Sequence, residues 1–594
     1  MKFRSLLLFL SAIAISCNSP EKIQQEAQDF LDGYTEKFLE LYAASSEAEW
    51  AANTKIIDGD TTNASATAKA NEAYAQFTGS EENIKNARKW LEKGEKLKPI
   101  QVKQFESILY KAANNPATVK EVVSKRIKAE SAQNEALFGF DFKLDGESLT
   151  ANEIDGRLRG LKDLDDRKKL WEASKEVGQV LKPGLLELRD LRNQTVQALG
   201  YDDYFGYQVS DYGMTTKEMM DLNGKIIHDL QPLYRELHTW MRYTLAEKYH
   251  VDVPEMLPAH WLPNRWGQDW SSEVEVEGID LDDVLEQKDP EWLVKQSERF
   301  YMSLGFEALP PVFYEKSSLY PLPEGANYKK NNHASAWHMD LKNDVRSLMS
   351  VEANSEWYET THHELGHIYY YLTYTNPDVP PLLRGGANRA FHEGIGSMMG
   401  LAAMQKPFLE GLDLIEKGLE TDDTQSLLKE ALNYVVFIPW SAGVMTGFEN
   451  EIYSNSLSAD KFNVKWWELK KKYQGIVPPT DRGEEYCDAS SKTHINNDAA
   501  QYYDYALSYV LLFQLHNHIA KNFLDGNPRA TNYYGNKEIG KFLHKMLYPG
   551  ASTDWRELLK ETTGEELGAQ AMLDYFEPLM DYLREQNKGR KHTI

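Results

Sequence analysis

Two histidines and a glutamate in one short segment have the types and spacing needed to hold and use a metal ion. His363, Glu364 and His367 form a His-Glu-x-x-His sequence. Two imidazoles four residues apart project from the same face of an α-helix, so one zinc ion can contact both nitrogens. Glu364 lies between them, where it can take a proton from water held at the metal. The pattern predicts a zinc centre with Glu364 as general base.

A second helical segment supplies a candidate for the third ligand. Glu393 lies in an amphipathic stretch over residues 391–397, and its carboxylate would complete three protein ligands and leave a fourth position for water. The segment around the histidines is itself predicted to be helical, because an apolar stripe at helical spacing runs beside them, formed by Leu365, Ile368, Tyr369 and Leu372. His362 cannot share the face of His363 and is expected to pack or to support a ligand.

The length, composition and charge of the chain limit the classes of protein to which it can belong. A chain of 594 residues with 42% hydrophobic side chains is long enough for two lobes with a cleft between them. The formal net charge of −25 argues against nucleic acid or anionic lipid surfaces as partners, since phosphate binding needs a basic face. We find no apolar run of 18 residues, so a membrane-spanning helix is not expected.

The first residues are typical of an export signal. Lys2 and Arg4 precede an apolar run over residues 5–16, and Cys17 follows a sequence similar to a bacterial lipobox. We expect residues 1–16 to be a lipoprotein-type signal peptide and Cys17 to be the lipidated first residue of the mature chain. The predicted location is the bacterial cell envelope, as a periplasmic or surface lipoprotein anchored only by lipid, with the outer membrane favoured because Asn18 is not Asp. A cleaved signal and a soluble secreted or periplasmic protein is the alternative.

Residues 17–594 are expected to form a single catalytic domain built mainly of helices. The chain from Glu21 to about Tyr110 is rich in helix-forming residues, and we find no internal repeat. Alternating strand patterns are few and short, which leaves room for only a small sheet. The main Pro- and Gly-rich interruptions, read as loops, cover residues 254–263, 309–323, 376–386 and 478–483. Cys487 is the only other cysteine and is expected to be a packed small residue.

Beyond the zinc motif, the chain resembles the peptidyl-dipeptidase family of angiotensin-converting enzyme, the gluzincin family M2. The similarity covers nearly the whole mature chain and is carried by residues 49–54, 268–270, 303–305, 333–337, 362–367, 386–388, 391–393, 466–475 and 575–583. The resemblance implies a mainly α, two-lobed helical ellipsoid with a deep central cleft, a very small β component and a zincin-type active site. It implies one Zn²⁺ ion and the release of dipeptides from the C-terminus of oligopeptides with a free carboxylate.

The resemblance also assigns roles to individual residues. The substrate carboxylate would be held by Gln268, Lys492 and Tyr502. The substrate main chain would pair with His333 and the backbone of Ala334, and the oxyanion would receive hydrogen bonds from His494 and Tyr505. One inserted residue after His494 makes Tyr503 the competitor of Tyr502. Gln268 stands where the family's carboxypeptidase has Arg, which favours dipeptide release.

Three departures from the family pattern carry consequences. Asp504 and Lys470 stand where the animal enzymes have chloride-binding arginines, so chloride activation is predicted to be weak or absent. Ser397 replaces the family's Asp one turn after the third ligand, so the support of a zinc imidazole must differ.

Two other functions remain open at this point. One is another helical His-Glu-x-x-His carboxypeptidase or oligopeptidase that shares the centre but cuts elsewhere. The other is a non-catalytic peptide- or glycan-binding envelope lipoprotein that uses its 33 Tyr and 14 Trp as stacking surfaces. A pure binder has no use for Glu364, which argues against the second.

Overall fold

A computed structural model describes residues 19–57, 59–276 and 281–594 of the chain. The predictions made for residues 1–16 and for Cys17 lie outside these residues. In the described part the fold is mainly helical, as expected, and the strands form only three two-stranded sheets. The strands are β1 Phe142–Leu144, β2 Glu147–Leu149, β3 Leu257–Pro258, β4 Ser335–His338, β5 Val345–Leu348 and β6 Ile476–Val477.

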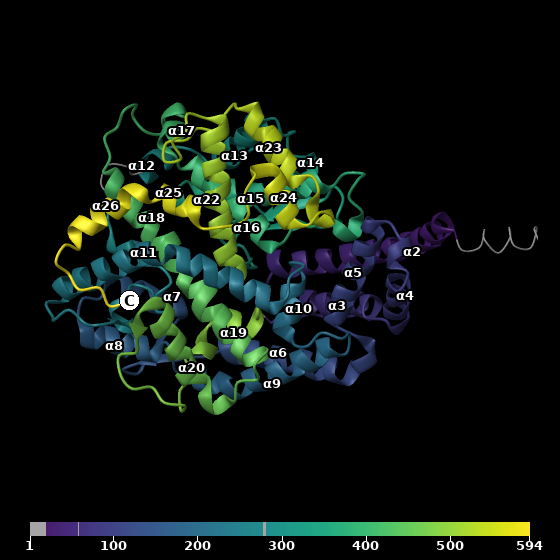
Figure 1. Cartoon of the computed structure of the whole chain (residues 1–594), viewed down its shortest axis with the longest axis horizontal. Helices are drawn as coiled ribbons and strands as arrows, with labels where there is room; N and C mark the ends of the chain where they lie inside the picture. Colours follow the sequence, from purple (N-terminus) through teal and green to yellow (C-terminus); the bar gives the residue numbers. More distant parts are fainter. Residues whose placement is uncertain (1–18, 58, 277–280) are drawn as a thin grey trace, which may run out of the picture.

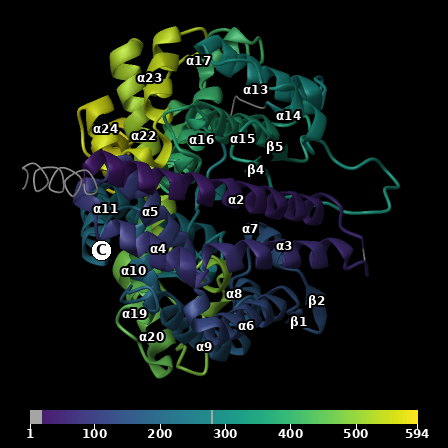
Figure 2. The same ribbon diagram turned by 90° about the vertical axis from the view of Figure 1, so that its right-hand side faces the viewer.

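The helices fall into an N-terminal group and two halves of the main body (Figures 1 and 2). The N-terminal group is α2 Pro20–Thr54, α3 Thr62–Thr78, α4 Glu81–Leu91 and α5 Pro99–Ala113. The lower half in Figure 1 contains α6 Lys120–Phe138, α7 Ala151–Gly160, α8 Leu164–Ala173, α9 Val177–Gln197, α10 Tyr204–Ser210, α19 Thr446–Tyr453 and α20 Phe462–Leu469. The upper half contains α13 Pro290–Leu304, α14 Pro311–Lys316, α15 Ser355–Tyr374, α16 Arg389–Ala403, α17 Lys406–Gly411, α23 Lys537–Leu547 and α24 Trp555–Thr563.

Further helices connect these halves or close the left side in Figure 1. They are α11 Thr216–Tyr249, α12 Asp282–Leu285, α18 Asp423–Ile438, α21 Thr493–Asn497, α22 Tyr503–Phe523, α25 Gln570–Tyr575 and α26 Glu577–Gln586. The long α11 begins at a reciprocal cap, in which Thr215 accepts from the Glu218 backbone and Glu218 accepts from the Thr215 backbone. The loop predicted over residues 309–323 contains one short helix, α14, because Pro310 and Pro311 fix the backbone angle of a first helical turn.

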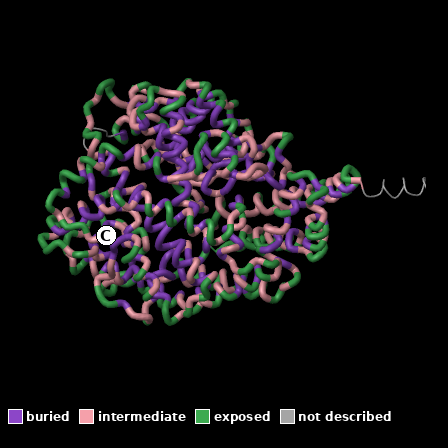
Figure 3. The backbone as a smooth tube through the Cα atoms, viewed as in Figure 1, coloured by how far each residue is buried: buried purple, intermediate pink, exposed green. Residues whose placement is uncertain are grey.

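The N-terminal helices have a hydrophobic core of their own. Ile23, Leu31, Phe38 and Phe105 pack there, separately from the large cluster that runs through both halves of the main body. In Figure 2, α2 crosses the front of the molecule between the upper and the lower helices. Side chains join this layer to the body at several points: the Tyr42 hydroxyl donates to the carbonyl of His338 at 3.1 Å, the Ser107 hydroxyl donates to the carbonyl of Leu382 at 3.1 Å, and Arg346 donates to Glu47 at 3.0 Å. The buried backbone in Figure 3 is concentrated in the body.

One described helical stretch has the length and apolarity of a membrane span. Asp423–Tyr453 reaches a mean hydropathy of 1.2, yet 89% of that window is buried inside the protein, as in the core helix of a folded domain. Cys487 is free and buried, and burial raises the pKa of its thiol to about 11. The thiol is therefore packed and unreactive at neutral pH.

Candidate active site

The helix α15 carries His363, Glu364 and His367 and packs directly against α16, which carries Glu393. Each helix begins at an asparagine: the Asn354 side chain accepts from the Trp357 backbone, and Asn388 accepts from the Phe391 backbone. These caps fix where each helix starts and hence which side chains face the partner helix.

Two glycines allow the helices to approach closely at the metal residues. A Cβ atom on Gly366 would lie 3.0 Å from the Cα of Gly396, and a Cβ atom on Gly396 would lie 3.0 Å from Nε2 of His363. Any larger residue would push α16 away from the histidines. The glycine inside the His-Glu-x-x-His sequence therefore has a packing role, which brings Glu393 to His363.

The three predicted ligands converge. The donor atoms of His363, His367 and Glu393 all lie within 4.8 Å of one another. Nε2 of His367 is 3.1 Å from Nε2 of His363, which in turn is 3.7 Å from Oε2 of Glu393. Ligands held tetrahedrally at zinc distances would be about 3.3 Å apart. The set of two imidazoles and one carboxylate therefore fits a zinc ion in both chemistry and spacing.

The outer nitrogens of both imidazoles have partners that point Nε2 towards the site. Nδ1 of His363 lies 3.4 Å from the Ser397 hydroxyl, and Nδ1 of His367 lies 2.9 Å from Nδ1 of His392. Ser397, predicted to change the support of a zinc imidazole, thus lies against His363. His392 was not identified from the sequence, although its position next to Glu393 was a usable signal. His362 is fully buried and bonds the carbonyl of Tyr358 through Nδ1 at 2.7 Å, so it packs away from the ligands.

Glu364 is 6% exposed and sits among the ligands, and its Oε2 atom has no hydrogen-bond partner in the described residues. Burial, with Glu393 adding a like charge, raises the pKa of Glu364 to about 8. A cation held by the neighbouring ligands would lower this pKa again. Oε2 is itself enclosed, but the Glu364 side chain lines the cavity over the ligands, where its carboxylate can meet a water molecule.

A cavity of about 1160 Å³ opens over the ligands. It is larger than the 300–1,000 Å³ or so of ordinary small-molecule sites, and it suits a peptide. Its walls include His363, Glu364, His367 and Glu393, the segment from Ala334 to Ala336 at the start of β4, and residues of α5 such as Lys103 and Tyr110. Ala334 therefore lines the cavity over the ligands, whereas His333 is exposed and does not line it.

The predicted carboxylate residues form a separate cluster. Nζ of Lys492 donates to Oε1 of Gln268 at 3.0 Å and lies 5.5 Å from the centre of the Tyr502 ring. The lysine is enclosed by aromatic rings, with Trp266 at 5.4 Å and Trp440 at 5.7 Å, and burial followed by the charge of Arg265 lowers its pKa to about 7. These two tryptophans were not found from the sequence. The cluster offers a cation with no carboxylate bonded to it.

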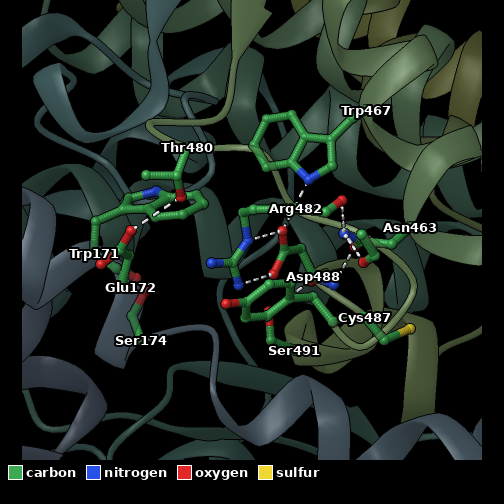
Figure 4. A network of polar contacts seen from close by, with 12 residues as sticks. Trp171, Glu172, Ser174, Asn463, Trp467, Thr480, Arg482, Cys487, Asp488 and Ser491 are labelled. Carbon is green, nitrogen blue, oxygen red and sulfur yellow. Dashed lines mark hydrogen bonds and ion pairs between the residues drawn. The ribbon is translucent and has the colours of Figure 1, made fainter.

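A buried ion-pair network holds the segment that leads into Lys492 (Figure 4). The Asp488 carboxylate accepts from Nε and Nη2 of Arg482 at 2.7 Å each and from Nε1 of Trp467 at 2.8 Å. The Ser491 hydroxyl donates to the carbonyl of Asp488 at 2.6 Å. Because these charges are paired inside the protein, the position of Lys492 is fixed from its N-terminal side.

His494 and Tyr505 adjoin this cluster through Tyr502. The Tyr505 hydroxyl is 3.3 Å from Nε2 of His494, and the ring centres of Tyr502 and Tyr505 are 4.9 Å apart. Burial, then the charge of Lys492, lowers the pKa of His494 to about 4, so its ring is neutral. Tyr503 points elsewhere: it is buried against Phe205 and Tyr212. The geometry therefore brings Tyr502, and not Tyr503, to Lys492.

Arg389, at the start of α16, links Tyr505 to the helix that carries Glu393. This arginine was not identified from the sequence. Its guanidinium makes two hydrogen bonds to Asp498, at 3.0 and 2.8 Å, and Nη2 lies 3.4 Å from the Tyr505 hydroxyl. Its Nε is 3.6 Å from Asp504, whose other oxygen accepts from the Tyr212 hydroxyl at 2.5 Å. The two acids hold the arginine against the tyrosine.

Comparison with known proteins agrees with this site. The family model described as angiotensin-converting enzyme matches residues 21–594. Angiotensin-converting enzyme of Oryctolagus cuniculus is 28% identical over 96% of this chain and 44% of the rabbit protein, and that of Mesocricetus auratus is 32% identical over 71% of this chain and 33% of the hamster protein. The angiotensin-converting enzyme-related protein of Drosophila melanogaster is 31% identical over 74% of this chain and 72% of its own length. The chain spans less than half the length of the two mammalian enzymes. On this evidence the chain belongs to the angiotensin-converting enzyme family of peptidases.

Proposed function

We propose that this protein is a zinc peptidyl-dipeptidase, which removes dipeptides from the C-terminus of oligopeptides. One observation carries the proposal: a zinc-type ligand set and a buried Lys492 without a carboxylate partner occur in one molecule, with His494, Tyr502 and Tyr505 beside the lysine. The rings of these three residues are 4.9 to 5.8 Å apart, and the charge of the ligand Glu393 acts on Tyr505. A terminal carboxylate at Lys492 would leave a short stretch of peptide reaching back to the ligands.

Each group has a task in this reaction. Bound zinc would polarise the scissile carbonyl and increase the acidity of the attacking water. Glu364 takes the proton of that water with its carboxylate and then delivers a proton to the leaving amine. Tyr505 and the neutral His494 stabilise the negative charge that develops on the carbonyl oxygen. Gln268, Lys492 and Tyr502 bind the terminal carboxylate, and the Ala334 backbone pairs with the substrate chain.

The decisive experiment is mass spectrometry of the products from an amino-blocked pentapeptide with a free C-terminus. Release of the terminal dipeptide that stops on adding a zinc chelator supports the proposal. Release of single residues would instead identify a carboxypeptidase, and no cleavage would favour the peptide- or glycan-binding protein. Glu364→Gln should retain zinc and fold but lose most turnover; full activity in this variant would refute the assignment of the base.

A second matched test concerns the carboxylate site. Lys492→Met should raise KM for the free peptide but have little effect on a C-terminally amidated one, since only the free peptide offers the carboxylate to the lysine. Lys471→Met serves as the control. It removes the same charge from a lysine in segment 470–474 that does not contact Gln268. Equal effects of Lys492→Met on both peptides would remove this lysine from the binding site.

We further propose that the protein works in the bacterial cell envelope, anchored by lipid on Cys17. Support comes from the signal-like residues 1–16 and the Cys that follows them. Metabolic labelling with a fatty acid should mark the wild type and not Cys17→Ser; equal labelling of both would contradict the anchor.

A further inference from the structure

Beside Tyr502 and Tyr505, four side chains form a second group that the mechanism above does not use. They are Asp269, Glu359, Tyr434 and Tyr509, which we call the acidic subsite. Three of them lie close in the sequence to a site residue. Asp269 follows Gln268, Glu359 precedes His363 by one helical turn on the same face of α15, and Tyr509 follows Tyr505 by one turn of α22.

Aromatic contacts join two members of this group to the carboxylate site. The rings of Tyr434 and Tyr509 are 5.0 Å apart, and Phe437 contacts Tyr509 at 5.1 Å and Tyr502 at 6.0 Å. Burial raises the pKa of Tyr509, and the charges of Asp269, Glu393 and Glu359 raise it further. Because Phe437 also touches Tyr502, the group adjoins the carboxylate site.

Polar atoms here lack partners inside the protein. Within the described residues, the Tyr434 and Tyr509 hydroxyls and the Glu359 carboxylate make no hydrogen bond or ion pair, and all three residues are half-buried. Asp269 accepts one hydrogen bond, from the Ser271 backbone at 2.8 Å, through Oδ1. Because these polar groups still meet solvent, they can exchange water for the polar group of a ligand.

The acids of this region, Asp269 and Glu359, make no ion pair in the described residues, although the amine of Lys492 is bonded to Gln268, the neighbour of Asp269. Behind Glu359 lies a further carboxyl, Glu430, which accepts from the Tyr575 hydroxyl at 2.9 Å. Burial raises the pKa of Glu430 to about 7 despite that hydrogen bond, and Glu359 adds to the effect. An arriving cation would therefore relieve repulsion and satisfy unpartnered oxygens together.

We infer that the acidic subsite recognises a Lys or Arg side chain in the last two residues of the substrate, so that the enzyme favours oligopeptides ending in a basic dipeptide. This inference rests on the proposed function. The last residue must place its carboxylate at Lys492 and Gln268, and its side chain then lies beside Asp269. The penultimate residue lies nearer the metal ligands, and its side chain is within reach of Glu359.

The test uses amino-blocked pentapeptides that differ at one residue, with Arg, its uncharged isostere citrulline, or Glu placed at the last or the penultimate position. We expect kcat/KM for Arg to exceed that for citrulline by about tenfold, the effect of one partly screened ion pair. Glu should be the poorest of the three. Asp269→Asn should reduce the Arg preference at the last position, and Glu359→Gln should reduce it at the penultimate position.

Glu356→Gln is the matched control, because Glu356 is on the same helix as Glu359 and makes the same charge change on the exposed surface. Its Arg preference should equal that of the wild type. Zinc content is measured for every variant, and Asp269→Asn still tests the inference if Glu359→Gln loses metal. Chelator-sensitive dipeptide release with equal rates for Arg, citrulline and Glu would overturn the inference and leave the proposed function standing. No dipeptide release from any peptide would overturn the proposed function itself.

Discussion

Replacing Arg389 by Met should reduce both the stability and the turnover of the protein, and the loss of stability should depend on pH. In the wild type Arg389 is bonded to Asp498, with side-chain exposures of 34% and 29%, and lies beside Asp504, which is 2% exposed. Burial raises the pKa of Asp504 to about 7, although Arg389 and the Tyr212 hydroxyl oppose that shift. Without the arginine, the folded-state pKa of Asp504 would rise further.

The sign follows from linkage. A carboxyl whose folded pKa is raised contributes its full stability below the unfolded pKa and loses it as pH rises towards the folded pKa. In the wild type this loss of stability ends near pH 7, whereas in Arg389→Met it continues to higher pH. At pH 7 we expect a destabilisation of about 1 kcal/mol, from the partly exposed pair with Asp498. Above pH 7 the deficit should grow by about 1.4 kcal/mol per pH unit until Asp504 ionises in the variant.

Turnover should fall as well, because Nη2 of Arg389 lies 3.4 Å from the Tyr505 hydroxyl. Loss of a whole oxyanion donor costs about 10²–10³ in kcat, so a misplaced but present tyrosine should cost about tenfold, mainly in kcat. Urea unfolding at pH 6, 7, 8 and 9 measures the stability, and dipeptide release measures the turnover. Arg389→Lys should recover part of both.

The control is Arg556→Met, which removes an arginine paired with Asp554 at 2.6 Å on the wall of the same cavity. Its stability deficit should be small and constant with pH. A deficit for Arg389→Met that is equal at pH 6 and pH 9, together with unchanged kcat, would refute the reasoning on Asp504 and Tyr505.

Three further predictions concern the metal helices, the carboxylate site and chloride. Gly396→Ala should weaken zinc binding at least tenfold, because the added methyl would lie about 3.0 Å from Nε2 of His363 and force α16 outward; zinc affinity by competition with a chelator checks this, and Gly224→Ala, inside helix α11 with nothing within 4 Å of the added methyl, reports the effect of a methyl elsewhere. KM should rise as pH increases through and above 7, because burial lowers the pKa of Lys492 to about 7 and the neutral amine loses its attraction for a carboxylate; a pH-independent KM for the free peptide would contradict this. Adding chloride at constant ionic strength should leave activity unchanged, because Asp504 already places a negative charge against Arg389; a clear rise in rate would show that an anion binds there after all.

The sequence alone specified the chemistry and the class of fold, because local patterns carry both. The His-Glu-x-x-His spacing sets two imidazoles on one helical face whatever surrounds the helix, and the helical composition needs no tertiary information. The helix starts at Asn354 and Asn388 also rest on a local capping pattern, although they were not predicted from the sequence. The roles of Gln268, Lys492 and Tyr505 came from resemblance, since a lone lysine or tyrosine carries no local signal.

Tertiary structure decided what depends on residues distant in the chain. Only the packing of α15 on α16 shows why Gly366 and Gly396 must be small, and only the fold places His392 behind His367. The choice of Tyr502 over Tyr503 required the path of the loop after His494, because adjacent residues at a helix start point in different directions. The contacts of Arg389 with Asp498 and Tyr505 join positions more than a hundred residues apart, and such pairings are set by close packing rather than by any periodicity in the sequence.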